Sequence, residues 1–498
     1  MLETLYSNLT GMPLTTAFAA CAQAVIIYCI WRIIYQIYFH PLSKFPGPWL
    51  AAVTYLYKFR LVVSGNHHKI IDELHKKYGE TIRIGPNELS CIHPTALKDV
   101  YGHHPTAQTF TKDPRLYSSP LGQTESIVTI TDINRHAGVR RLLSHAFSDR
   151  ALSEQEDIIQ MYVDKLMVKL RDQAKQGPFN IIHWFNFFTF DIIGELSFGE
   201  SFNCLSQGQM DDWITVILGR VKALAIAWGI RSFPLLNKTY HYFLPASLRQ
   251  QGAKHMAYSR GKVSKRLQST AERKDFISCL DREGIISSFT VEEISAHTAS
   301  LVLAGSDTTA TSLSGICYYL SKNPEAYKIL ANEIRNTFQE EKEITHLSCQ
   351  RLSYLQAVIE EGLRLYPPLP IGAPRLAPKG GAMMGDIYVP DKTYVSVPSW
   401  TLTHLEANFP DAWSFKPERW LSRSSPDLRD QSQPFLLGPR GCIGRNLAML
   451  EMRLVLSKLF WNFDFEIINR DLIWERDQTA YIAWQKPQLI FQLTPRRL

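Results

Sequence analysis

The sequence predicts a mainly α-helical protein with a few small β-sheets, preceded by one membrane-spanning helix. Three observations support this fold class. From about Ala151 to Glu272 the apolar residues recur at helical spacing, with breaks at glycine and proline. Strand-like runs are short, as at residues 81–85 and 88–94, which a Pro-Asn turn signal separates. Residues 12–31 contain no charged side chain, and a run of this length can cross a bilayer at about 1.5 Å per residue.

The uncharged run from Met12 to Trp31 is interpreted as a signal anchor. Only Glu3 is charged before the run, whereas Arg32 and further basic residues follow it. The positive-inside rule therefore places the N-terminus in the lumen and the body of the protein in the cytoplasm. The alternative is a cleaved signal peptide, which the missing basic segment and the length of the run disfavour. The glycosylation sequon at Asn8 would lie on the lumenal side, very close to the membrane.

A proline-rich connector follows the anchor. Pro41, Pro46 and Pro48 restrict the backbone and disfavour a helix, so we expect a stiff spacer between the membrane and the body. These features divide the chain into an anchor (1–32), a hinge (33–50) and one large domain (51–498).

Composition and cysteine spacing exclude several classes of function. The net charge of +7 is modest for 498 residues and no long Lys/Arg run occurs, so nothing in the sequence supports nucleic-acid binding. The eight cysteines are scattered and form no C-x-x-C pair. This pattern argues against a disulfide framework and against a structural zinc site.

A long central helix is predicted in the second half of the chain. It begins at a capping box formed by Thr290 and Glu293 and ends before Asn323-Pro324. Its middle reads AGSDTT, residues 304–309, which is a cluster of poor helix formers that includes Asp307 and Thr308. Poor helix formers at the centre of a long helix suggest function rather than stability.

Two further helices carry charged pairs at helical spacing. In the segment 136–148, His136 and Arg140 lie on one face, four residues apart. A later helix, which ends at Tyr366-Pro367, carries Glu361 and Arg364 three residues apart. The segment FKPERW that contains Arg419 follows, and the alternating runs 386–398 and 481–493 predict strands of small sheets.

Cys442 stands in a glycine-rich loop that leads into another apolar-periodic helix. At a helix N-terminus the positive end of the dipole and the free N–H groups favour a thiolate. Glycines around the sulfur, Gly444 among them, let a large flat partner approach closely. Arg440 offers a permanent cation to an acidic group on that partner. The alternative is that Cys442 is an ordinary cysteine that packs as a small buried hydrophobic residue.

Phe435, Gly438, Arg440, Cys442 and Gly444 match F-x-x-G-x-R-x-C-x-G, the haem-binding loop of the cytochrome P-450 family. The chain resembles this family over about its whole length, because AGSDTT, E-x-x-R and the PERW segment precede the loop in the expected order. The resemblance implies the family's mainly helical haem-thiolate fold. Because the four motifs must surround one cofactor, it also implies one domain.

The resemblance implies a role for each residue that would touch the cofactor. Cys442 would be the axial thiolate ligand of the iron in haem b (iron protoporphyrin IX), in the loop that also holds Phe435 and Gly444. Asp307 would relay protons, and Thr308 would supply a hydrogen bond on the oxygen-binding face. The propionate contacts would be Arg140, Arg375, Arg440 and His136, the last in place of the usual tryptophan.

Other residues receive a structural role from the same resemblance. In the family the E-x-x-R pair is buried and is joined by the arginine of the PERW segment. Glu361, Arg364 and Arg419 would therefore lock the fold around the haem rather than take part in catalysis.

The implied reaction is monooxygenation, in which one atom of O2 enters the substrate and the other leaves as water. Electrons would come from NADPH through a membrane-bound reductase that docks near Cys442, with cytochrome b5 as a further candidate partner, at the endoplasmic reticulum membrane. Arg141, Arg445 and Lys458 are candidate contacts for the reductase. The alternatives are a haem-thiolate isomerase or dehydratase, and a haem sensor without turnover; the intact Asp307–Thr308 pair argues against both.

The substrate class is read from three segments that would border the pocket. Residues 299–304, 371–374 and 480–484 are largely apolar and offer no charge clamp, which predicts a lipophilic small molecule. The hinge is similar to that of membrane-bound fungal members of the family. By this analogy the substrate is an intermediate of fungal secondary metabolism, such as a terpenoid, a polyketide or an alkaloid.

Overall fold

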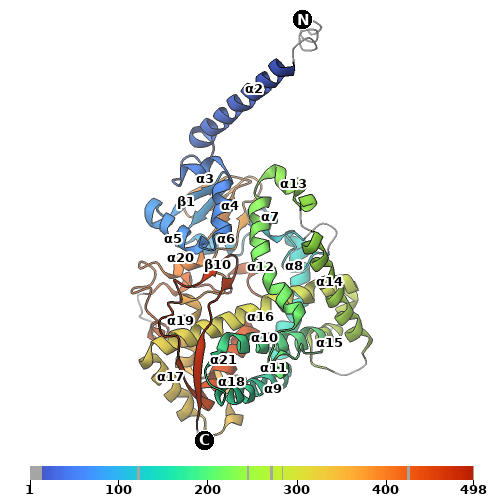
Figure 1. Cartoon of the computed structure of the whole chain (residues 1–498), viewed down its shortest axis with the longest axis vertical. Helices are drawn as coiled ribbons and strands as arrows, with labels where there is room; N and C mark the ends of the chain where they lie inside the picture. The colour runs from blue at the N-terminus through green and yellow to red at the C-terminus, as the bar shows by residue number, and fades with distance from the viewer. Residues whose placement is uncertain are drawn as a thin grey trace.

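The computed structural model describes residues 14–119, 124–243, 246–269, 273–282, 284–422 and 427–496. Helices form most of a broad body, and the first helix projects away from it (Figure 1). The predicted fold class, mainly helical with small sheets, is confirmed. The sequon at Asn8 and the first two residues of the uncharged run lie outside the described residues.

The amphipathic stretch that begins at Ala151 forms long helices that end where glycine or proline interrupts the pattern. Gly199 adopts the left-handed conformation (φ +69°) that ends α10, and Pro234 is the first residue of α13. The helices up to this point are α2 (Leu14–Ile34), α3 (Trp49–Val53), α4 (Leu56–Val63), α5 (His67–Tyr78), α6 (Ala96–Tyr101), α7 (Pro114–Tyr117), α8 (Ile133–Leu143), α9 (Asp149–Ala174), α10 (Ile181–Phe198), α11 (Cys204–Gln207), α12 (Asp212–Arg231) and α13 (Pro234–Phe243).

The predicted central helix is α16, which crosses the middle of the body (Figure 1). Both bonds of its capping box are present: Thr290 Oγ1 accepts from the Glu293 N–H at 3.2 Å, and Glu293 Oε2 accepts from the Thr290 N–H at 3.0 Å. The helices of this half are α14 (Ala246–Gln268), α15 (Phe276–Arg282), α16 (Val291–Lys322), α17 (Pro324–Thr337), α18 (His346–Cys349), α19 (Ser353–Leu365), α20 (Ser399–Thr403) and α21 (Arg445–Asn462).

The strands form small sheets at the edges of the helical body. The largest sheet has the order β1-β2-β8-β5-β3, and a second has the order β4-β12-β9; β6 pairs with β7 and β10 with β11. The strands are β1 (Thr81–Gly85), β2 (Glu88–Cys91), β3 (Thr111–Lys112), β4 (Phe179–Asn180), β5 (Arg375–Leu376), β6 (Ala382–Met384), β7 (Ile387–Val389), β8 (Tyr394–Ser396), β9 (Phe463–Ile467), β10 (Thr479–Ala480), β11 (Trp484–Gln485) and β12 (Ile490–Pro495).

The N-terminal helix continues further than the sequence predicts. After α2 the chain forms a π-helix, Tyr35–Phe39, so the helical run passes residue 32. The stretch Phe18–Phe39 includes an 18-residue window with a mean hydropathy of 1.7 and no buried residue, so it is long and apolar enough to span a membrane; a signal sequence passes the same test.

A buried arginine connects this helix to the body. Gln36, on the π-helical turn, is 4 % exposed. The guanidinium of Arg83 on β1 donates to the Gln36 carbonyl at 2.7 Å and to Gln36 Oε1 at 2.6 Å. Helix and sheet are therefore connected directly, and not only through the proline-rich connector.

The main hydrophobic core lies where α10, α16, α19 and α21 pack together. Gly305 on α16 contributes to this packing, because a Cβ there would lie 3.2 Å from Ile193 Cδ1 on α10. The core thus fixes α16 relative to α21, the helix that begins just after Cys442.

Candidate active site

The loop that holds Cys442 is a tight turn fixed by its own backbone. The Cys442 N–H donates to the Phe435 carbonyl at 2.7 Å, and the helix α21 begins three residues later at Arg445. Gly438 has φ +68°, and a Cβ at this position would lie 2.1 Å from the Tyr101 carbonyl oxygen. Only glycine fits there, for both reasons.

Cys442 is both accessible and closely surrounded by protein atoms. The residue is exposed even though protein atoms surround it closely enough that burial raises the pKa of its thiol. The Gly444 N–H and the charges of Arg140 and Arg445 lower this pKa but do not offset burial. The Gly444 N–H at the start of α21 therefore favours the thiolate, but burial outweighs its effect on the pKa. A bound cation would shift the balance to the thiolate, because a coordinating thiol is deprotonated outright.

Four cationic side chains lie together near this loop. Lys112 on β3 is directly opposite Arg375 on β5, and both are buried, at 7 % and 3 % exposure. Like charges opposite each other on paired strands are unfavourable. Arg140 Nη1 donates to the Gly441 carbonyl at 2.5 Å, and Arg440 donates to the Thr131 carbonyl at 2.7 Å. In the described part of the chain, none of these four cations forms an ion pair with a carboxylate.

Burial and neighbouring positive charges lower the pKa values of three side chains in this cluster. Burial, followed by the charges of Arg440 and Arg375, lowers the pKa of Lys112 to about 6. Burial, with Lys112 as the next cause, lowers the pKa of His136 to about 3, so this imidazole is neutral. Burial, with Arg375 next, lowers the pKa of Arg440 to about 10. All three shifts disfavour the protonated form; burial is the largest cause of each, neighbouring positive charges add to it, and Asp132 opposes it at Arg440.

The AGSDTT segment lies at the middle of α16, and part of it is accessible. Ala304 is exposed although α16 is central, and Asp307 and Thr308 are half-buried. The Thr308 hydroxyl donates to the Ala304 carbonyl at 2.7 Å. Lys486 binds Asp307: its Nζ donates to Asp307 Oδ1 at 3.0 Å and to Thr311 Oγ1 at 2.5 Å.

Comparisons with known proteins agree with this geometry. A sequence model of the cytochrome P-450 family matches residues 45–493. The chain is 39 % identical to cytochrome P-450 monooxygenase atr2 of Stereocaulon alpinum over 498 residues, which covers 98 % of each chain. It is 40 % identical to cytochrome P-450 monooxygenase astJ of Aspergillus oryzae over 481 residues, 95 % of this chain and 96 % of the relative. The chain belongs to the cytochrome P-450 family. It is a monooxygenase of the haem-thiolate type, and the family implies a redox partner and a small-molecule substrate.

The residues of this P-450 fit a haem group. A porphyrin needs a thiolate on one face and partners for two carboxylates at its edge. Cys442, which is accessible, would supply the first, and the four cations, which have no carboxylate partner within the described residues, would supply the second. When bound, the haem would supply the oxygen chemistry.

Glu451 is a second acid near α16 of this P-450, and it belongs to none of the sequence motifs. It lies on α21 at 2 % exposure. Burial raises the pKa of its carboxyl to about 8, against an opposing hydrogen bond from the Thr309 side chain. Thr309 follows Thr308 directly, so a carboxyl group that holds its proton at neutral pH lies next to the AGSDTT segment.

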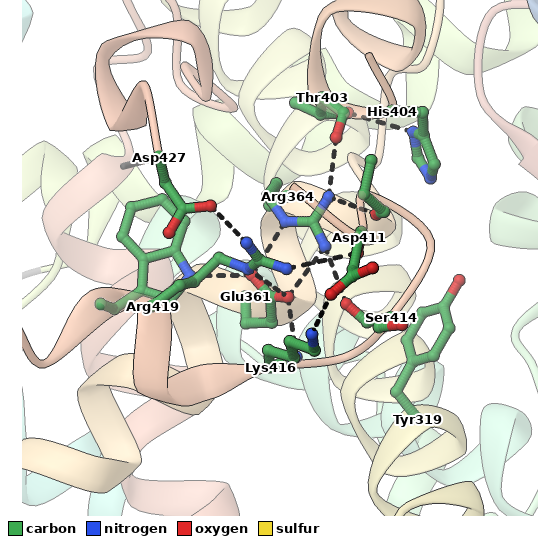
Figure 2. Close-up of polar contacts among 12 residues, drawn as sticks. Tyr319, Glu361, Arg364, Thr403, His404, Asp411, Ser414, Lys416, Arg419 and Asp427 are labelled. Atoms are coloured by element: carbon green, nitrogen blue, oxygen red, sulfur yellow. Dashed lines mark hydrogen bonds and ion pairs between the residues drawn. The ribbon is translucent and has the colours of Figure 1, made fainter. Parts of the chain in front are cut away.

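The scaffold motifs meet in a buried network, which Figure 2 shows. Arg364 donates twice to the Glu361 carboxylate, with both distances 2.8 Å, and both side chains are fully buried. Arg419 Nε donates to Glu361 Oε1 at 3.1 Å and also pairs with Asp427. Arg364 Nη1 donates to the carbonyls of Thr403 and Ala412 at 2.7 Å. The three predicted residues are therefore brought together, and each donor has an acceptor.

Of the basic residues named as contacts for a reductase, two are on the surface. Arg141 and Arg445 are exposed. Lys458 is 4 % exposed and pairs with Asp164, so it is part of the protein interior and not of a docking surface.

Two of the expected pocket segments contribute to an apolar cluster that includes Trp228 of α12. Ile371 packs with Val62, Leu116 and Trp228, and Ile482 lies against this group. Trp484 is instead part of the core, where its Nε1 donates to the Pro367 carbonyl at 2.8 Å.

Three site residues escaped the sequence analysis: Lys112, Glu451 and Lys486. Each lies outside the family motifs, and each acquires its partners only through packing between segments far apart in the chain. A lysine in a short alternating segment was one local indication for Lys112, but the sequence does not predict which residue lies opposite it in the sheet.

Proposed function

We propose that this P-450 hydroxylates, or oxidises further, a lipophilic intermediate of fungal secondary metabolism, with electrons from NADPH. The observation that carries the proposal is an accessible cysteine, Cys442, near four cations that form no ion pair with a carboxylate within the described residues. The fungal origin of relatives that align over nearly the whole chain supports the biosynthetic setting.

In this proposal each site residue has one role. Cys442 holds the iron, in the loop of Phe435 and Gly444. The propionates are bound by Arg140, Arg375, Arg440 and His136, together with Lys112. Asp307 and Thr308 deliver protons, because oxygen cleavage needs protons brought to a site from which bulk water is excluded. Glu361, Arg364 and Arg419 hold the scaffold.

The apolar cluster of Ile371, Trp228 and Ile482 borders the substrate chamber in this proposal. Its apolar side chains would bind a lipophilic ligand by burial of apolar surface, at about 25 cal/mol per Å2. We place the body on the cytoplasmic face of the endoplasmic reticulum, held by the apolar helix that ends at Phe39, where a membrane reductase and cytochrome b5 reach the surface near Arg141 and Arg445.

Spectroscopy and oxygen uptake test the proposal together. The reduced protein under CO should show the red-shifted Soret band of thiolate-ligated haem, and Cys442→Ser should abolish it. The wild type, mixed with reductase and NADPH, should consume O2, which an isomerase or dehydratase would not do. A sensor would show no substrate-linked NADPH consumption. Comparing the metabolites of cells with wild-type protein and with Cys442→Ser identifies the substrate.

A further inference from the structure

A small cavity lies beside the first half of α16. Three helices contribute side chains to its wall: Leu143 on α8, Phe276 and Leu280 on α15, and Thr298 and Leu301 on α16. The cavity offers about 20 Å3 of space to the centre of a water-sized molecule. Since about 10–15 Å3 of such space is enough for one water, the cavity has room for one small molecule and is far too small for a lipophilic substrate.

The surface of this cavity is almost entirely apolar. Its two polar side chains have partners within the protein. Thr298 Oγ1 donates to the Ile294 carbonyl at 2.9 Å. His297 Nδ1 accepts from the Ile127 N–H at 3.0 Å. An ordered water needs about two to four polar partners, which such a surface does not provide, whereas cavities lined by apolar side chains stay dry and take up xenon. The cavity therefore suits an apolar molecule of one or two atoms.

The wall of the cavity extends toward the loop of the candidate active site. Leu143 and Leu280 belong to one buried cluster, and Ile285 and Ile443 pack against it. Ile285 is half-buried just after α15, whereas Ile443 directly follows Cys442 in the sequence. Apolar side chains thus extend from a partly exposed residue, along the cavity, to the loop of the cysteine.

On α16 the cavity ends just before the AGSDTT segment. Leu301, which lines the cavity, is 8 % exposed. It lies four residues, about one turn, before Gly305 on the same face of the helix. Ala304, the first residue of AGSDTT, is exposed. Along the helix, Leu301 therefore separates the cavity from the accessible middle of α16.

We propose that this cavity is a binding site for dioxygen, from which the gas passes Leu301 to reach the site of oxygen chemistry. The inference rests on the proposed function, because only an oxygen-consuming enzyme has a use for such a site. Dioxygen is small and apolar, so it gains free energy by leaving water for an apolar cavity. It binds there without chemical change, and no proton or electron is transferred. The site holds O2 beside α16, while its apolar wall excludes water and ions.

Xenon tests whether the cavity takes up an apolar gas. Crystals of the full-length, haem-loaded protein are held under xenon pressure, and anomalous scattering locates the bound atoms. We expect xenon between α8, α15 and α16 in the wild type and a higher occupancy in Leu280→Ala. We expect none in Leu280→Phe, which adds volume to the wall. An ordered water in the cavity, or no xenon there in the wild type, overturns the proposal.

Carbon monoxide tests whether the cavity supplies the haem. It is an apolar diatomic gas like O2, and after a light flash its rebinding to the reduced haem is followed at the Soret band. We expect rebinding from solution to be several-fold slower in Leu280→Phe than in the wild type. Leu330→Phe is the matched control, because it enlarges a buried leucine on α17, far from α15 (Figure 1), and it should rebind CO at the wild-type rate.

The outcomes separate the cavity from the proposed function. Equal rebinding in the wild type and in Leu280→Phe overturns the role in oxygen supply and leaves the haem site intact. Equally slow rebinding in Leu330→Phe assigns the effect to packing strain and overturns that role as well. A wild type without the Soret band of thiolate ligation counts against the proposed function itself. Should Leu280→Phe not fold, Ile277→Phe fills the cavity from the preceding turn of α15 and is measured in its place.

Discussion

Two groups of buried charge lie in the body of this P-450, and they differ in whether the chain itself neutralises them. In the first, Glu361 accepts hydrogen bonds from Arg364 and Arg419, and the remaining donors reach carbonyls or Asp427. In the second, Lys112 and Arg375 lie opposite each other with Arg140 and Arg440 nearby, and burial and mutual repulsion lower the pKa of Lys112 to about 6. The first group is complete without a ligand. The second becomes favourable only when an anionic group from outside the chain joins it.

Breaking the complete network should have the largest effect. Glu361→Gln leaves two buried guanidinium groups without their shared carboxylate, so we expect a loss of about 3–5 kcal/mol in the free energy of unfolding. Urea denaturation measures this loss, and the yield of haem-loaded protein should fall with it.

A matched control is Glu466→Gln, which removes the partner of Arg470 from an exposed pair four residues apart in the chain, at 3.1 Å. We expect a change of at most about 0.5 kcal/mol there. Equal losses for the two substitutions would contradict the distinction between a buried network and a surface pair.

Glu451 sharpens the comparison, because it is a buried acid that has no cationic partner among the described residues and keeps its proton instead. Its folded pKa of about 8 lies above the ordinary 4.5. Between these values the folded state holds a proton that the unfolded state has lost, so stability falls as pH rises, by about 1.4 kcal/mol per pH unit. We expect Glu451→Gln to remove this dependence and to be the more stable protein at pH 8.5. Thermal unfolding of both proteins from pH 5 to 9 measures it, and parallel curves would refute the assignment.

The smallest effect on stability is expected in the second group, the cationic cluster around Lys112. Lys112→Met removes two hydrogen bonds, from Nζ to the carbonyls of Ile127 and Val128 at 2.7 and 2.8 Å. It also removes the repulsion from nearby like charges, so we expect the two effects largely to offset each other and the unfolding free energy to change by about 1 kcal/mol or less. Haem should be released about tenfold faster, the equivalent of one lost charge-assisted hydrogen bond. Transfer of haem to apomyoglobin, followed by absorbance, measures the rate. Lys112→Arg should behave like wild type, and unchanged release from Lys112→Met would place the propionates elsewhere.

Sequence reasoning succeeded where a local rule applied. The ends of α16 follow from its capping box and from Asn323-Pro324, and the tight turn at Cys442 follows from its glycines. It failed at Lys458, which was named as a surface contact and is buried against Asp164. Helical spacing shows which residues share a face, but it does not show which neighbour covers that face.

The sequence by itself determined the family, the cysteine loop, the central helix and an apolar N-terminal helix, because each is written in a contiguous stretch whose spacing is fixed by backbone geometry. Only the tertiary structure placed Lys112 opposite Arg375, Glu451 beside Thr309, and Lys486 on Asp307. These contacts join segments far apart in the chain. Burial and charge at such contacts arise from packing, and packing has no local pattern to read.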